Sequence, residues 1–174
     1  MNYPLRKPDP PAVYDGLQHA GEVCLWVHGG FHPQVTTKEY GVQPAVRGTI
    51  LMLSGRSTGV AFDNVMLWRK SAGQFADMDG GEVALCRIAK TSNGKGVVYE
   101  PGAGFDEQMA QQWIAGNGPR LEQLRTDAVR VYREECERPE NGPAAPARQS
   151  TPPLDGGTKR LDKDQPLPLD EPPF

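Results

Sequence analysis

Two predicted strands joined by a polar loop occupy residues 45–68, which read AVRGTILMLSGRSTGVAFDNVMLW. Branched and aromatic residues dominate both ends of the segment, and the loop between them runs over residues 54–59. Alternation in the second strand places Val65 and Leu67 on an inner face and Trp68 on the opposite side. The segment therefore predicts a hairpin with one buried face.

Three further strands are predicted around this hairpin. The five expected strands cover residues 22–28, 45–53, 61–68, 82–89 and 96–100. Gly29 and Gly30 interrupt the first strand, which is typical of a bulge or sharp bend, and the sequence leaves open whether the strand resumes over 34–40. One or two helical turns are expected over 69–78. Three strands, a short helix and two strands are the element order of the OB-fold, so we predict a mainly β, five-stranded Greek-key barrel.

Two helices are expected after the barrel. Phe105, Met109 and Trp113 recur at i, i+4 and i+8, and Gly116 closes this segment. Pro119 then opens a second helix that reaches about residue 137. We expect the three large apolar side chains of the first helix to pack on the sheet as core.

The composition predicts one soluble domain with an unpacked extension. The chain has 174 residues, a formal charge of -3 and 37% hydrophobic residues, with Gly 20 and Pro 17. No apolar run is long enough for a membrane span, and the first residues lack the core of a secretory signal. The three cysteines form no C-x-x-C pair, so neither a disulfide framework nor a zinc site is expected, and a reducing cytoplasm fits best.

The chain divides into four predicted parts. Residues 1–18 form an extended N-terminal arm, 19–116 the OB-fold domain, 117–137 a C-terminal helix, and 138–174 a linker and tip. The last part holds nine of the 17 prolines, so we expect a disordered tail.

Aromatic and cationic residues alternate along the predicted strands and loops. A single-stranded nucleic acid needs flat rings on which unpaired bases stack and cations that follow its phosphates. The alternative is that these aromatics are barrel core, and we expect about half of them to be buried. The candidate nucleic-acid-binding residues are Trp26, Phe31, Lys38, Tyr40, Arg47, Arg56, Trp68, Arg69, Arg87 and Lys90.

The sequence ends in an acidic pair, a rigid dipeptide and an aromatic residue, namely Asp170, Glu171, Pro172, Pro173 and Phe174. This end resembles the tip of bacterial-type single-stranded-DNA-binding proteins, although Pro172 stands where that family has an apolar residue. The resemblance implies a tip that recruits replication or repair enzymes. The aromatic ring would fill an apolar pocket, and the carboxylates would meet basic groups.

A second resemblance covers roughly residues 20–115. The runs 35–41, 45–47, 62–68 and 81–87, followed by a helix that starts Phe-Asp-Glu, are similar to a divergent group of phage- and plasmid-encoded OB-fold proteins to which single-stranded-DNA binding is ascribed. This resemblance supports the predicted fold.

No enzyme motif is present, so we predict neither catalytic activity nor a cofactor nor a bound metal. His28 and His32 are expected in a loop, within reach of nucleic acid. The predicted function is sequence-tolerant single-stranded-DNA binding in replication, recombination or repair, in the nucleoid or a host cytoplasm, with no membrane partner. The alternative is an OB-like protein-binding adaptor or virion component. The sequence does not fix the oligomeric state, and a homo-oligomer is compatible with it.

Overall fold

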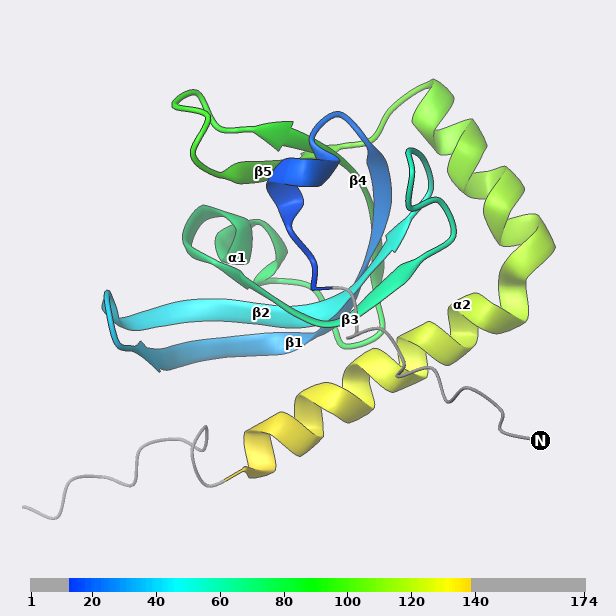
Figure 1. The fold of residues 1–174 in the computed structure, drawn as a ribbon. Coiled ribbons are helices and arrows are strands. Elements are labelled where there is room, and N and C mark those ends of the chain that lie inside the picture. Colours follow the sequence, from blue (N-terminus) through cyan, green and yellow to red (C-terminus); the bar gives the residue numbers. More distant parts are fainter. Residues whose placement is uncertain (1–12, 139–174) are drawn as a thin grey trace, which may run out of the picture. The chain divides into compact units, whose positions relative to one another are not determined.

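Five antiparallel strands form one open sheet in the computed structural model, which describes residues 13–138 (Figure 1). The strands are β1 (Val23–Thr37), β2 (Gly41–Met52), β3 (Ala61–Trp68), β4 (Val83–Lys90) and β5 (Val97–Pro101), and their order in the sheet is β3-β2-β1-β4-β5. The helices are the 3-10 helix η1 (Gly16–His19), α1 (Arg69–Phe75) and α2 (Phe105–Glu137). The predicted mainly β class and the short helix between the third and fourth strands are confirmed.

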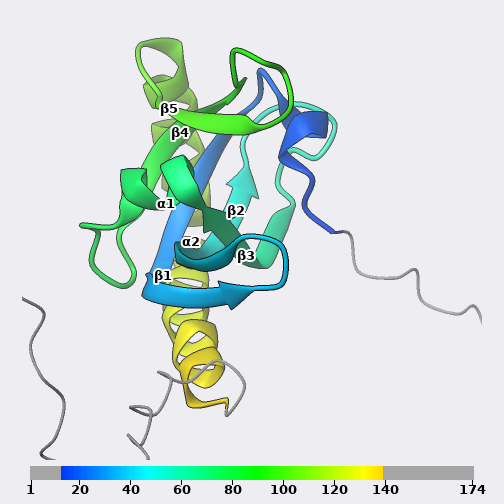
Figure 2. The same ribbon diagram turned by 90° about the vertical axis from the view of Figure 1, so that its left-hand side faces the viewer.

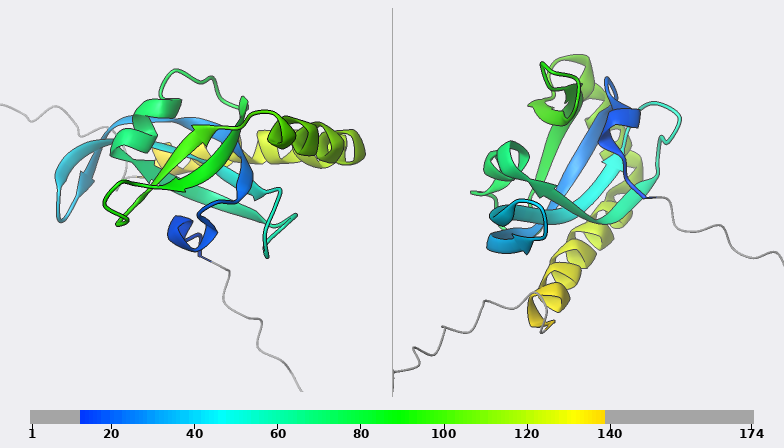
Figure 3. Two further views of the ribbon diagram at one scale, coloured as in Figure 1. Left: turned by 90° about the horizontal axis from the view of Figure 1, so that it is seen from above. Right: turned by 60° about the vertical axis from the view of Figure 1, so that its left-hand side comes forward.

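The central strand β1 separates two hydrophobic cores. Cys24 and Trp26 point toward α1 and belong to a core that also contains Phe75. Leu25 and Val27 point the other way, into the core covered by α2. Successive side chains of a strand face opposite sides of the sheet, so a strand buried on both faces is apolar at nearly every position. The two helices accordingly lie on opposite faces of the sheet (Figures 2 and 3).

The glycine pair in β1 marks a bulge, as predicted. The register with β2 shifts between His28 and Gly30. A Cβ atom on Gly29 would lie 2.6 Å from the backbone oxygen of Ala128 in α2, and one on Gly30 would meet the ring of Tyr132. Glycine is therefore required at both positions, because α2 packs directly on the backbone of β1. Beyond the bulge, β1 continues to Thr37.

The expected closed barrel is wrong, because β3 and β5 are not hydrogen-bonded to each other. The side chain of Gln74 in α1 lies against β5 instead. Its Nε2 donates to the carbonyl oxygen of Tyr99 at 2.9 Å, and its Oε1 accepts from the Tyr99 amide at 3.4 Å. The side chain of Gln74 thus satisfies the two backbone groups of Tyr99, which a barrel-closing strand would otherwise pair.

The segment before β1 packs between β3 and β5. The Tyr14 hydroxyl lies 2.9 Å from the Tyr99 hydroxyl, and the Tyr14 ring lies 5.4 Å from the ring of Phe62. The carboxylate of Asp15 accepts from the amide of Leu17 and caps η1. Residues 13–18 of the expected extended arm therefore fold back onto the open side of the sheet.

One kinked helix replaces the two expected after the sheet. Asn117 has φ -134° and ψ 24° inside α2, and Pro119 follows it, so the predicted boundary between the two helices falls at this kink. Met109 and Trp113 pack against the core as predicted. Phe105 does not, because it stands in the first helical turn and is 72% exposed. No helix within residues 13–138 is both long enough and apolar enough to span a membrane.

Candidate nucleic-acid interface

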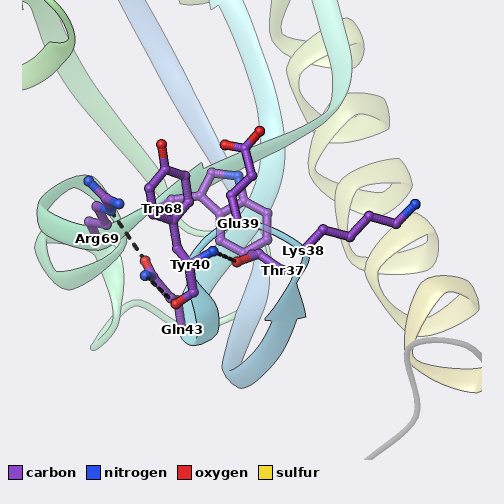
Figure 4. Close-up of a pocket in the computed structure, with 7 residues that line it drawn as sticks. All are labelled: Thr37, Lys38, Glu39, Tyr40, Gln43, Trp68 and Arg69. Atoms are coloured by element: carbon purple, nitrogen blue, oxygen red, sulfur yellow. Dashed lines mark hydrogen bonds between the residues drawn. The ribbon is translucent and has the colours of Figure 1, made fainter.

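An open groove lies between the tip of the β1–β2 hairpin and the junction of β3 with α1 (Figure 4). Its volume is about 430 Å³. It is lined by Thr37, Lys38, Glu39, Tyr40, Gln43, Trp68 and Arg69. These residues come from β1, β2, β3 and α1 and from the turn between β1 and β2, so the groove exists only in the folded sheet.

The hairpin turn holds Tyr40 in place. The Thr37 hydroxyl accepts from the Tyr40 amide at 3.0 Å and donates to the carbonyl oxygen of Gly41 at 2.9 Å. Gly41 has φ +68°, a conformation that favours glycine. The Tyr40 side chain is 60% exposed, so its ring is presented to solvent on a hydrogen-bonded turn.

Arg69 covers the ring of Tyr40. The carbon of its guanidinium lies 4.3 Å from the ring centroid, and its Nε donates to Gln43 Oε1 at 3.3 Å. Gln43 Nε2 in turn donates to the carbonyl oxygen of Tyr40 at 3.1 Å. Arg69 has φ +55°, a left-handed conformation that costs a residue with a side chain roughly 1–2 kcal/mol. A ring, a cation and an amide side chain are thus held together in one corner of the groove.

Trp68 lies beside this corner at the end of β3. It pairs with Ala45 of β2 and is the residue before the first turn of α1. Val65 and Leu67 are buried in the core, which confirms their predicted inward assignment. Trp68 itself is half-buried and lines the groove.

Four of the ten candidate binding residues line the groove: Lys38, Tyr40, Trp68 and Arg69. Lys38 is exposed, and its amine points away from Tyr40 and Arg69 in Figure 4. The groove therefore combines two aromatic side chains with a cation on one of the rings and a second cation at its edge.

The prediction that Trp26 and Arg47 bind nucleic acid is wrong, because both side chains are buried and neither is accessible to a ligand. Trp26 is fully buried, its ring lies 5.3 Å from that of Phe75, and its indole N–H donates to His28 Nδ1 at 3.2 Å. Arg47 is 6% exposed and lies under α2, where its Nη2 is 3.7 Å from Glu135 Oε2. Both residues hold the fold together.

Four other candidates lie outside the groove. Phe31 is half-buried against the core that contains Trp26. Arg87 is ion-paired with Asp106 at the start of α2, and its Nη1 also donates to the carbonyl oxygen of Gly21 at 2.9 Å. Arg56 and Lys90 are exposed, in the β2–β3 loop and at the end of β4.

Three polar groove residues were not predicted: Thr37, Glu39 and Gln43. The sequence left open whether a strand resumes over 34–40, and the structure shows that the strand ends at Thr37, the chain turns at 38–40 and Thr37 pairs with Gly41. The signal was the polar run Thr36 to Glu39 with Gly41 two residues after it, a pattern typical of a turn.

The two histidines are buried in β1, so the prediction that they lie in a nucleic-acid-contacting loop is wrong. His28 and His32 are 0% and 7% exposed. Burial lowers the pKa of both imidazoles. Burial raises the pKa of the Cys86 thiol to about 12, and no group of three metal-ligating side chains occurs within the described part of the chain. The tip from Asp170 to Phe174 lies outside the described residues.

Comparison with known proteins identifies no relative: no family model, curated protein or solved structure matches this chain.

Proposed function

We propose that this protein binds single-stranded DNA without strong sequence preference, through the groove at the β1–β2 hairpin. The observation that carries the proposal is the exposed Tyr40 ring beside Trp68 and Arg69 in one open groove. Unpaired bases of any sequence stack on aromatic rings, and each such contact contributes ~1–3 kcal/mol. Exposed base faces are absent from duplex DNA, so duplex binding should be weaker.

The arrangement of the sheet supports an OB-like domain as the scaffold. The strand order β3-β2-β1-β4-β5 and the position of α1 between β3 and β4 fit an OB-fold in which the β3–β5 seam is left open. OB-folds bind oligonucleotides on the face of strands 2 and 3 and with the loop between strands 1 and 2. The groove occupies the corresponding hairpin and the end of β3.

The charge distribution limits how such binding would work. The whole chain has a formal charge of -3, and Arg47 and Arg87 already have carboxylate partners within the fold. Bulk positive charge therefore contributes little, and stacking in the groove must supply much of the affinity.

The test is a titration of labelled oligo-dT and of a matched duplex, followed by fluorescence anisotropy. We expect salt-sensitive binding to the single strand and weaker binding to the duplex. Trp68→Phe should keep the fold and alter affinity, whereas Trp113→Phe, on α2, should not alter it. Absence of oligo-dT binding at low salt would favour the protein-binding adaptor instead.

The proposal includes the C-terminal tip as the recruiting element for replication, recombination or repair enzymes, which places its action in a nucleoid or a host cytoplasm. Its support is the acidic pair and the aromatic residue at 170–174. Deletion of residues 169–174 should leave oligo-dT affinity unchanged or slightly higher and abolish capture of partner enzymes. Equal capture by both forms would contradict this part of the proposal.

A further inference from the structure

The guanidinium of Arg69 occupies the ring face on which a base would stack. It lies 4.3 Å from the Tyr40 centroid, and a base between the two would need about twice the spacing of one stacked pair. A base therefore reaches this face of Tyr40 only if the guanidinium leaves it.

The contacts that hold Arg69 on the ring are weak compared with base stacking. Besides the ring, Arg69 has one hydrogen bond, the 3.3 Å contact to Gln43, and no ion pair is found for it among residues 13–138. An exposed cation–π contact favours the position of the guanidinium on the ring by a factor of about two to five. A stacked base contributes about fivefold to 150-fold in affinity, so stacking can offset the loss of the cation–π contact.

The backbone of Arg69 is strained where it presents the guanidinium to the groove. Its φ of +55° is unfavourable for arginine and would suit glycine, and it occurs where β3 turns into α1. A strained conformation that presents a cation to the groove is a candidate functional feature, because strain of this kind concentrates at ligand sites.

We infer that Arg69 gates the Tyr40 ring: an unpaired base takes the place of the guanidinium, which then pairs with a neighbouring phosphate. The inference rests on the proposed single-strand binding and adds its regulation. Arg69 would act both as a competitor of the base and as a phosphate contact, and the two roles depend differently on salt. Stacking is insensitive to salt, whereas each phosphate contact to a single strand adds about 0.7 to the slope of log affinity against log salt.

The test is Arg69→Gly, which relieves the strained φ and removes the guanidinium. Oligo-dT affinity is measured from about 50 to 500 mM salt. Combining a twofold to fivefold gain from the uncovered ring with the loss of one phosphate contact, we expect binding roughly twofold to fourfold weaker near 50 mM and up to about threefold tighter near 500 mM. The two affinity lines should therefore cross, and the slope should fall by about 0.7.

Two controls separate the gate from simpler roles. Lys70→Ala removes the adjacent exposed cation, which does not line the groove, and should give no gain at high salt. In a Tyr40→Ala background, Arg69→Gly should lower the slope without any gain at high salt, because no ring is left to uncover.

The outcomes distinguish this inference from the proposed function. If the wild-type protein binds oligo-dT and Arg69→Gly is weaker at every salt concentration, Arg69 is only a phosphate contact and the gate is wrong. An unchanged affinity would also overturn it. If the wild-type protein does not bind oligo-dT, the proposed function fails and the gate with it.

Discussion

Replacing Arg47 should destabilise the fold rather than weaken a nucleic-acid contact. The guanidinium lies between β2 and α2, where its Nη1 donates to Asn64 Oδ1 and its Nη2 is 3.7 Å from Glu135 Oε2. The two charged side chains are only 8% and 9% exposed. In Arg47→Met, the volume is largely kept and the positive charge is lost, so the carboxylate of Glu135 stays buried without this partner.

The size of the effect follows from burial. Removing one partner of a buried ion pair costs ~3–5 kcal/mol when the other charge is left uncompensated. Arg138 Nη1 remains 3.1 Å from Glu135 Oε1, but Arg138 is largely exposed and its attraction is screened by solvent. We therefore expect a loss of about 2–4 kcal/mol in the free energy of unfolding.

Urea unfolding monitored by tryptophan fluorescence measures this loss. The double variant Arg47→Met with Glu135→Leu should recover most of it, since an apolar pair of similar volume is often as stable as a buried ion pair. Arg56→Met, at an exposed loop position, is the matched control and should leave the urea midpoint unchanged. If Arg47→Met is as stable as the wild-type protein but no longer binds oligo-dT, the reasoning is refuted and Arg47 is a binding residue.

Three further predictions concern the groove, the open seam and the core. Tyr40→Ala should weaken oligo-dT binding about fivefold to 150-fold at unchanged stability, because the ring is 60% exposed; Tyr40→Phe keeps the ring and should bind normally in the same anisotropy assay. Gln74→Ala should lower the free energy of unfolding by about 1–3 kcal/mol, because both backbone groups of Tyr99 lose their partner; an unchanged urea midpoint would mean that water replaces the side chain. Burial lowers the pKa of His28 from 6.5, so His28 binds a proton more tightly in the unfolded chain than in the folded one. The free energy of unfolding should therefore be constant above about pH 6.5 and fall below it. A pH series of urea midpoints checks this in the wild type and in His28→Asn, whose side-chain oxygen can still accept from the Trp26 indole. The decline should be smaller in the variant, and the remainder belongs to His32, whose pKa burial also lowers; an equal decline in both would contradict the assignment to His28.

Local patterns predicted the parts of the fold that depend on local chemistry. The bounds predicted for the third strand match β3, and Val65 and Leu67 at its end are buried as the alternation there predicted. The long β1–β2 hairpin was not predicted, since a polar turn without an Asn-Gly or Asp-Gly pair carries little local signal. The open edge between β3 and β5 could not be predicted either, because it depends on the contact of Gln74 with Tyr99 in β5, which lies 25 positions away in the sequence.

The candidate site shows the same limit. The local sequence around an aromatic residue in a predicted strand is the same whether the ring packs in a core or stacks a base. Trp26 is fully buried, whereas Tyr40 is 60% exposed. The deciding factor is the position of each residue relative to the other elements: Trp26 lies where β1 is covered by α1, and Tyr40 lies in a turn beyond the reach of either core. No periodicity within the run encodes that difference.

The tip of the hairpin that carries Tyr40 is a two-stranded ribbon without a third strand beside it. The part of β2 that precedes Ala45 pairs with β1 alone, and the pairing of β4 with β1 ends at Val27. A two-stranded ribbon is marginally stable by itself, so the 35–43 tip should open more readily than the rest of the sheet. The contact between Arg69 and Tyr40 ties this tip to α1. A base that displaces the guanidinium would therefore also release the hairpin, and the groove could widen around the strand without any cost to the two cores.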